Sequence, residues 1–138
     1  MSERMVVIAI ALGGAAGSMA RYGLSLVAIS MLPGWLIAGT LAANIAGSAL
    51  IGLIAAWSVR RMPSPILSGF LVTGFCAGFT TFSAFSLEAL LFAMSGAWAV
   101  ALGYIAASIV GWMVAVWAGW SGGMALFAAK EAVAQTKS

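Results

Sequence analysis

Four long apolar stretches constrain how this 138-residue chain can fold more than any other feature. Breaks of only two to six residues separate them, and they cover residues 5–32, 35–59, 66–94 and 98–127. About 20 apolar residues in a helix cross the hydrocarbon of a bilayer, so each stretch is long enough to span it. With 64% hydrophobic and only 7% charged residues, the composition excludes an ordinary soluble domain. We therefore predict an all-α integral membrane protein with four transmembrane helices.

The four helices are expected to form a single domain, residues 1–138, that ends in a polar C-terminal tail, residues 128–138. Arg4 before an apolar run is also typical of a secretory signal, but the apolar character continues past residues 13–17. An uncleaved first helix is therefore the better interpretation. The single cysteine, Cys76, has no partner for an internal disulfide and no histidine for a metal site, which favours a small buried residue.

The distribution of basic residues predicts the topology. An even number of helices places both termini and the second connection on one side of the membrane, and that side carries Arg4, Arg60, Arg61, Lys130 and Lys137. The other two connections carry no charge, so the positive-inside rule predicts cytoplasmic termini. Trp35 and Trp98 would mark one interface, and Trp57 and Trp120 the other. This sorting accounts for the net charge of +3, and no nucleic-acid partner is indicated.

The third apolar stretch contains an unusual segment, residues 74–88, with the sequence GFCAGFTTFSAFSLE. It is rich in glycine, threonine and serine at a depth where water is absent. A broken helix survives there only if it is buried in protein or lines a pathway. We predict a break near the centre of the third helix, and a conduit beside it.

Small residues recur every four positions on each helix, a pattern that lets helices pack closely in lipid. The predicted ridges are Gly13 and Gly17; Gly39, Ala43 and Gly47; Gly74 and Gly78; and Gly103, Ala107, Gly111 and Ala115. Close packing alone explains most of these residues. It does not explain the polar residues that lie among them.

Polar side chains also share helix faces. Asn44 lies mid-span between Thr40 and Ser48, and Tyr104 and Ser108 are one turn apart on the fourth helix. An unpartnered amide at that depth is expensive, so Asn44 makes an interhelical hydrogen bond or faces a pathway. Because the second, third and fourth helices all carry polar residues, one shared lining is favoured over several unrelated bonds.

Phe82 and Phe85 lie three residues apart, on one side of the third helix and among hydroxyl residues. Phenylalanine is ordinary filler in a membrane helix, and that interpretation suffices for Phe70, Phe75 and Phe92. An aromatic ring, however, has a positive edge. Two ring edges turned toward a pathway would favour a small anion without adding a fixed charge.

The 74–88 segment resembles the signature of the Fluc (CrcB) fluoride channels, GFxGGxTTFSTFSxE. Similar matches run along the whole chain in order: GGAAGSMAR at residues 13–21, GTLAAN at 39–44, and Gly103 to Ser108 on the fourth helix. The resemblance implies a fluoride-selective channel that exports fluoride passively across the inner (plasma) membrane. It also implies an antiparallel, dual-topology dimer with two pores.

The resemblance assigns roles to individual residues. It implies that Phe82 and Phe85 form an aromatic box along the fluoride path and that the amide of Asn44 donates to the ion. A structural, non-transported sodium ion would bind the main-chain carbonyls of Ala77 and Thr80 at the dimer centre.

Other polar residues would extend the path: Thr81, Ser83, Tyr104 and Ser108. Arg21 either attracts anions at a pore mouth or snorkels to the interface. Glu88, two turns beyond Thr81 and near the membrane surface, is expected to have a structural or gating role, because a carboxylate in the path would repel an anion.

The chain departs from the family pattern in three respects. Ala77 replaces the first glycine of the GG pair, and Trp112 stands where a small polar residue is expected one turn after Ser108. The basic residues are also strongly biased to one side, whereas dual-topology proteins normally carry little bias. The partner is therefore either a second copy of the chain or an oppositely inserted homologue.

Two other functions are consistent with the size of the chain. A small multidrug exporter would need a carboxylate deep in the first helix, where the sequence has none. A non-transporting scaffold subunit leaves Asn44 and the TTFSAF run unexplained. Drug-dependent proton release would support the exporter, and a complete lack of ion flux the scaffold. An enzyme is not expected, because the chain has no histidine and no nucleophile paired with a base.

Overall fold

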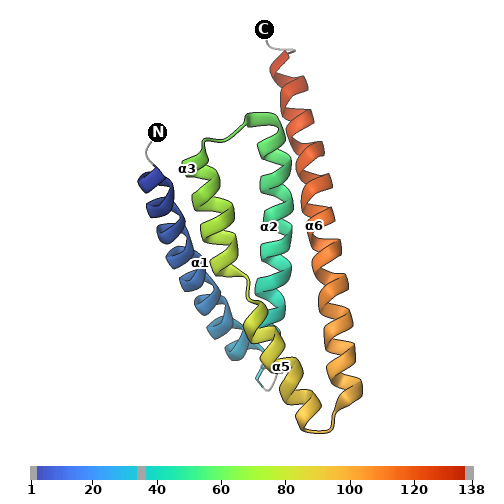
Figure 1. The fold of residues 1–138 in the computed structure, drawn as a ribbon. Helices are drawn as coiled ribbons and strands as arrows, with labels where there is room; N and C mark the ends of the chain where they lie inside the picture. Colours follow the sequence, from blue (N-terminus) through green and yellow to red (C-terminus); the bar gives the residue numbers. More distant parts are fainter. Residues whose placement is uncertain (1–2, 34–36, 136–138) are drawn as a thin grey trace.

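The computed structural model describes residues 3–33 and 37–135, and their fold is a bundle of long helices (Figure 1). Three helices are continuous: α1 (Glu3–Met31), α2 (Ala38–Arg61) and α6 (Trp98–Gln135). The third crossing is composite, with α3 (Pro65–Ser68), η1 (Gly69–Cys76), α4 (Ala77–Phe79) and α5 (Phe82–Met94) in succession. Four spans are long and apolar enough to cross a membrane: Glu3–Met31, Ala38–Arg61, Pro65–Met94 and Trp98–Ala129. The prediction of four membrane helices is confirmed.

The helix ends differ from the sequence prediction mainly at the C-terminus. Helix α6 continues to Gln135, so residues 128–135 of the expected polar tail extend the last helix (Figure 1). Two residues used to predict the topology, Trp35 and Lys137, lie outside the described residues.

The chain enters and leaves the bundle at the same end. The start of α1, the connection between α2 and α3, and the end of α6 all lie at the top of Figure 1, and the turn between α5 and α6 lies at the bottom. Arg4, Arg60 and Arg61 therefore belong to one end of the molecule. Which side of the membrane this end faces remains a prediction.

Local sequence signals determine where the helices end. Met62, in the left-handed region with φ 46°, stops α2, and Gly96, with φ 82°, makes the turn between α5 and α6. The Ser64 hydroxyl accepts the Leu67 N–H at 3.3 Å, and Pro65 occupies the first helical position. Both are typical of a helix start.

Helix α1 packs against the composite helix backbone to backbone. A Cβ added at Gly13 would collide with the Phe70 carbonyl, and one at Gly17 with the Phe75 carbonyl. From the other side, a Cβ at Gly78 would meet the Gly14 carbonyl. The predicted ridges on these two helices are therefore confirmed, and no side chain separates the helices at this contact.

The stretch Gly69–Cys76 is a π-helix, which the sequence analysis did not predict. A π-helix is wider than an α-helix and has more residues in each full turn of the backbone. Here it keeps Gly69 and Gly74 buried against α1 and encloses Cys76 completely. The π segment thus leads directly from the α1 contact to the break that follows.

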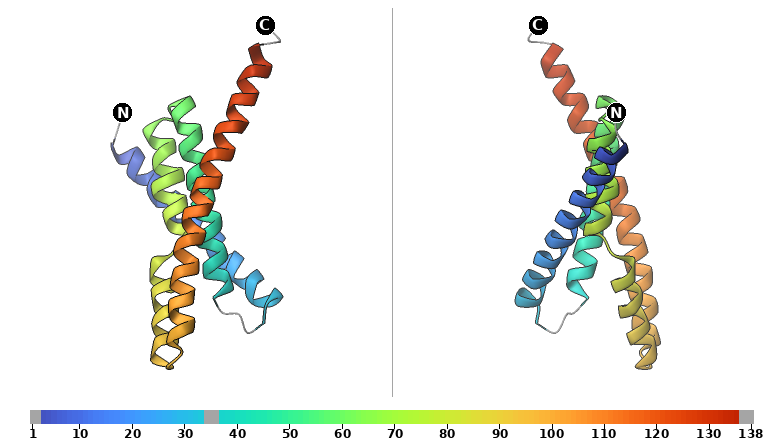
Figure 2. Two further views of the ribbon diagram at one scale, coloured as in Figure 1. Left: turned by 90° about the vertical axis from the view of Figure 1, so that its right-hand side faces the viewer. Right: turned by 60° about the vertical axis from the view of Figure 1, so that its left-hand side comes forward.

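Helices α2 and α6 cross closely at the centre of the bundle (Figure 2). Gly52 faces the Val116 carbonyl, and Gly119 faces the Ala49 carbonyl. Of the ridge predicted on the fourth helix, Gly103 and Ala107 are exposed in this chain. The inward face of α6 carries Ala101, Tyr104 and Ser108 together with Ala115 of the predicted ridge, because α6 is rotated to meet α5 as well as α2.

The interior is built from small side chains. Six of the buried hydrophobic residues are alanines: Ala9, Ala43, Ala56, Ala89, Ala101 and Ala115. Large apolar side chains such as Leu12, Leu102 and Trp117 point outward and are at least 60% exposed. This inversion is expected for helices that face lipid, where close approach of backbones stabilises the bundle.

The glycine contact between α1 and the third crossing predicts a specific intolerance to side chains. Gly17→Ala should destabilise the folded protein by about 1–3 kcal/mol, because the Phe75 backbone cannot yield without moving a whole helix. Thermal unfolding in detergent measures the loss. Gly23→Ala is the matched control on the same helix, since nothing lies within 4 Å of its added methyl. Equal unfolding temperatures for the two variants would contradict the close packing.

Candidate functional site

The third crossing is broken at Thr80 and Thr81. Helix α4 ends at Phe79, both threonines have extended backbones (ψ 160° and 121°), and α5 begins at Phe82. The Thr81 hydroxyl accepts the Ala84 N–H at 3.2 Å and so caps the start of α5. The break predicted from the run of glycine, threonine and serine is confirmed.

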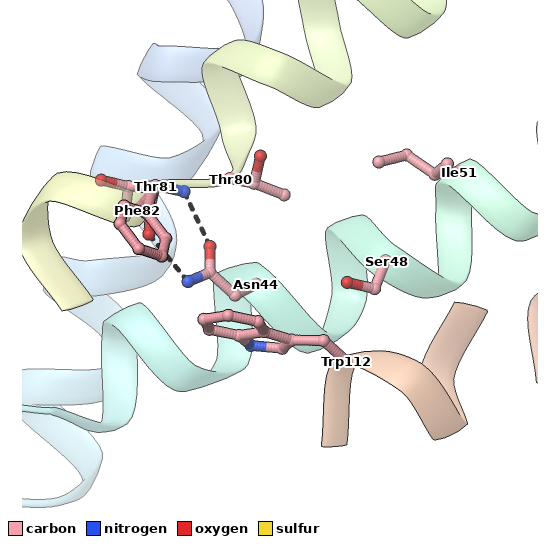
Figure 3. Close-up of a pocket in the computed structure, with 7 residues that line it drawn as sticks. All are labelled: Asn44, Ser48, Ile51, Thr80, Thr81, Phe82 and Trp112. Carbon is pink, nitrogen blue, oxygen red and sulfur yellow. Dashed lines mark hydrogen bonds between the residues drawn. The ribbon is translucent and has the colours of Figure 1, made fainter. Parts of the chain in front are cut away.

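The side chain of Asn44 pairs with the broken backbone. Its Nδ2 donates to the Thr81 carbonyl at 2.8 Å, and its Oδ1 accepts the Thr81 N–H at 2.7 Å (Figure 3). Asn44 is only 4% exposed, at a depth where an unsatisfied backbone group costs several kcal/mol. One amide thus satisfies both polar groups of the residue at which the helix opens.

Helix α1 holds the other side of the break. Arg21 Nε donates to the Gly78 carbonyl at 3.3 Å, and the Ser18 hydroxyl lies 3.4 Å from the same oxygen. Sequence reasoning placed Arg21 at a pore mouth or at the interface, whereas its nitrogen contacts the last turn before the break. A positive group there also complements the negative end of a helix.

An open pocket of about 210 Å³ lies beside the break. Its wall combines the break, one face of α2 and one ring from α6, and it is lined by Asn44, Ser48, Ile51, Thr80, Thr81, Phe82 and Trp112 (Figure 3). Among the described hydrogen bonds, none involves the Ser48 hydroxyl. The pocket therefore joins polar groups with aromatic faces.

The two phenylalanines of the motif touch but differ in burial. Their ring centroids lie 5.6 Å apart with the rings tilted by 52°. Phe82 is 72% exposed, and Phe85 is only 5% exposed. Phe85 meets Tyr104 at 5.3 Å and Trp112 at 4.9 Å, the latter edge to face. Phe85 is therefore anchored inside the bundle, and Phe82 is presented on its surface.

Glu88 joins three helices. Its two carboxylate oxygens accept hydrogen bonds of 2.6 Å from the Thr40 hydroxyl on α2 and the Tyr104 hydroxyl on α6. The polar patterns predicted Thr40 and Tyr104 as shared-face residues, but not that Glu88 is their partner. The Tyr104 hydroxyl is therefore engaged with Glu88 from α5.

The remaining predicted residues lie near the aromatic pair. The Ser83 hydroxyl is 3.3 Å from the Thr81 hydroxyl, on the exposed side of α5. Ser108 is completely buried, one turn from Tyr104 on α6. Asn44, Thr81, Phe82, Phe85, Tyr104 and Ser108 thus form one continuous neighbourhood, which Arg21 meets only through the break.

The carbonyls of Ala77 and Thr80 have the chemistry of a cation site. In the described part of the chain, no hydrogen bond ends on either oxygen, because the N–H of Thr81 pairs with Asn44 and that of Ala84 with the Thr81 hydroxyl. Ala77 is also exposed. Free carbonyl oxygens are the hard ligands that an alkali cation accepts. The described residues contain no cluster of His, Cys, Asp or Glu that could hold a metal ion instead.

Together these features define a class: a four-helix membrane protein with a polar, aromatic-lined break in one helix. Comparison with known proteins specifies the family. Residues 8–120 match the family described as CrcB-like protein, Camphor Resistance (CrcB), so the chain belongs to this family.

The chain matches named relatives over nearly the whole length of those relatives. The chain is 47% identical over 119 residues to the fluoride-specific ion channel FluC of Paracoccus denitrificans (strain Pd 1222), which is 86% of this chain and 94% of the relative. It is 42% identical over 121 residues to the protein of the same name from Gloeobacter violaceus, 86% of this chain and 96% of the relative. The relatives are named as channels, which confirms that the chain is a multi-pass membrane protein and not an enzyme.

The pairing of Asn44 with Thr81 predicts a large effect on stability. Asn44→Ala would leave a buried N–H and a buried carbonyl unsatisfied, so we expect a loss of about 2–6 kcal/mol, or about 1–3 kcal/mol per group. Thermal unfolding in detergent measures it. Ser48→Ala, one turn along the same helix and without a described hydrogen bond, is the matched control. If Asn44→Ala unfolds at the same temperature as Ser48→Ala, Asn44 does not stabilise the break.

Proposed function

We propose that this protein is a fluoride-selective channel that conducts fluoride passively out of the cytoplasm across the inner membrane and so lowers its toxicity. The relatives named fluoride-specific ion channel support this proposal, since they match over more than nine tenths of their own length. The observation that carries it is the pocket at the break, which is lined by Asn44, Thr81 and Phe82 and continued by Phe85.

The pocket offers what a small anion needs when it loses water. Fluoride must exchange its hydration shell for comparable hydrogen-bond donors. The Nδ2 group of Asn44 carries two hydrogens, and the Thr81 carbonyl uses one of them. The second N–H and the hydroxyl of Ser48, which makes no hydrogen bond among the described residues, would donate to the ion. The ring edges of Phe82 and Phe85 would add weak attraction without a fixed charge.

The polar residues beyond the pocket would continue the path. Thr81 and Ser83 present hydroxyls on the outer side of the break, and Ser108 offers one on the inner side. Tyr104 would contribute by holding Phe85 and Glu88 in place, since its own hydroxyl is engaged. Arg21 would add positive potential through its place at the Gly78 carbonyl.

The surface around the break supports a dimer. Phe82 is 72% exposed, Ala77 is exposed, and the carbonyls of Ala77 and Thr80 lack hydrogen bonds within the described chain. A second subunit in antiparallel orientation would cover this face and contribute its own break. The bias of Arg60 and Arg61 toward one end leaves two candidates for that subunit, an oppositely inserted copy and an oppositely oriented homologue.

A structural sodium ion fits the dimer centre. Two carbonyls from each subunit, those of Ala77 and Thr80, would make four hard oxygen ligands. Bound sodium would supply a fixed positive charge that neutralises the carbonyl dipoles at the break. The role of the protein is to hold these carbonyls free, which the bonds of Thr81 N–H to Asn44 and of Ala84 N–H to Thr81 accomplish.

The alternative functions have less support. The only carboxylate of α1, all of whose residues are described, is Glu3 at its first position, so a proton-coupled multidrug exporter lacks its essential group. A scaffold subunit needs close helix packing but not a pocket that places the Ser48 hydroxyl beside Asn44 and Phe82.

Fluoride efflux from liposomes that contain this protein alone tests the proposal, read with a fluoride electrode against chloride-loaded liposomes. Fast efflux restricted to fluoride is expected, and it would also show that one kind of subunit suffices. No efflux from a folded sample, either alone or with an oppositely oriented homologue, would overturn the proposal. Equal efflux of both anions would overturn the selectivity.

The aromatic pair predicts a loss of conduction without loss of the fold. Phe82→Ile and Phe85→Ile should each lower fluoride efflux at least about tenfold, because an aliphatic side chain has no positive edge to offer the ion. Phe70→Ile, on the π segment away from the break, is the matched control and should conduct normally. Size-exclusion chromatography checks assembly. Wild-type efflux in Phe82→Ile or Phe85→Ile would remove that ring from the path.

Sodium should stabilise the assembled protein. At a concentration about 100 times its dissociation constant, sodium would add about 2.7 kcal/mol to the free energy of unfolding. We therefore expect a higher unfolding temperature in sodium than in N-methyl-D-glucamine at equal ionic strength. Identical unfolding temperatures would argue against a bound sodium ion, whatever the result for fluoride efflux.

A further inference from the structure

An apolar groove lies between α1 and the start of the third crossing, at the end of the molecule where α1 begins (Figure 1). Its volume is about 410 Å³. Helix α1 lines one wall with Met5, Ile8 and Leu12, each of which is at least half exposed. Ala9, the most buried of the lining residues at 8% exposed, forms the floor. The groove shares no lining residue with the pocket at the break.

The opposite wall comes from α3 and the start of η1, through Ile66, Leu67 and Phe70. Ser64, the residue before α3, is the one polar residue of the lining. Residues 5–12 of the α1 wall correspond to about 10 Å along the helix axis. Half of the hydrocarbon is about 15 Å thick, so the groove extends through most of one leaflet. Its depth and its apolar walls fit an acyl chain.

Basic residues flank the outer end of the groove. Arg4 directly precedes Met5, Arg61 lies three positions before Ser64, and both arginines are exposed. Glu3 is the only acidic residue in the first 70 positions of the sequence, so the two arginines outweigh it. Arginine beside an apolar membrane surface attracts the phosphate of an anionic lipid. The charge at this end therefore complements a negative headgroup.

A second copy of this chain would complement the groove less well. In an antiparallel dimer, the opposite end of the partner would lie alongside this end. That opposite end has its connections at residues 33–37 and 95–97, which contain no acidic residue. It would therefore offer no negative group to Arg4 and Arg61. A phospholipid supplies both an acyl chain for the groove and a phosphate for the arginines.

We propose that the groove between α1 and α3 binds an anionic phospholipid, with one acyl chain along Ala9 and the phosphate held by Arg4 and Arg61. The inference does not depend on channel activity, since the groove is separate from the pocket at the break. If two subunits insert in opposite orientations, their grooves take lipid from opposite leaflets.

Native mass spectrometry of the full-length protein in detergent tests the headgroup contact. The probes are phosphatidylglycerol and phosphatidylcholine with identical palmitoyl and oleoyl chains. We expect one phosphatidylglycerol to bind per subunit in a saturable manner, and more tightly than phosphatidylcholine. Arg4→Gln and Arg61→Gln should each weaken phosphatidylglycerol binding about fivefold, which corresponds to about 1 kcal/mol per arginine, and leave phosphatidylcholine binding unchanged.

The matched controls are Arg4→Lys and Arg61→Lys, which keep the positive charge and should bind phosphatidylglycerol as the wild type does. Equal affinities of the wild type for the two lipids would overturn the proposal. So would an undiminished affinity for phosphatidylglycerol in both glutamine variants.

A photoreactive phosphatidylglycerol with a diazirine in one acyl chain locates the lipid in liposomes. We expect labelling of residues 5–12 and 64–70. Ala9→Leu fills the floor of the groove and should remove most of this labelling, whereas Ala20→Leu, exposed on the same helix and outside the groove, should leave it unchanged. Labelling confined to other segments would overturn the proposal. An unlabelled groove in the assembled protein would do the same and indicate that a second subunit covers it. Neither result would bear on fluoride conduction.

Discussion

The pairing of one asparagine with a broken helix is the interaction on which the rest of this structure depends. A helix that opens inside a bilayer leaves a donor and an acceptor with no water to satisfy them. Asn44 supplies the complement of both at Thr81, with hydrogen bonds of 2.8 and 2.7 Å. Because these bonds occupy the Thr81 N–H, the Ala77 carbonyl is left without its usual helical partner. The pocket, the placement of Phe82 and the free carbonyls all follow from this one contact.

Three helices hold the two halves of the broken crossing in register. Helix α1 packs its glycines against the first half, and Arg21 binds the Gly78 carbonyl at its last turn. The second half is tied to α2 and α6 through Glu88, which accepts hydrogen bonds from Thr40 and Tyr104. The break is thus held by contacts on both sides, and the aromatic rings around Phe85 pack beside it.

The sequence predicted the number of helices and the place of the break because both depend on local composition. Apolar length alone identifies a membrane span, and the run from Gly78 to Ser83 marks where a helix opens. The sequence did not predict that Asn44 and Glu88 engage Thr81 and Tyr104, since partners across helices depend on how each helix is rotated. The same reason explains why Gly103 and Ala107 of the predicted ridge are exposed in this chain. A four-residue spacing identifies a helix face but not the neighbour that the face meets.

The π-helical stretch Gly69–Cys76 has a consequence for how this protein can vary in length. A π turn holds one more residue than an α turn requires, so losing a residue there would leave a continuous helix with satisfied hydrogen bonds. Loss of a residue from an α-helical turn between this stretch and the break would instead rotate everything after it by about 100°. Thr81 would then turn away from Asn44, and Phe82 from its present face. The π stretch can thus absorb a one-residue change in length that the α-helical turn before Thr80 cannot.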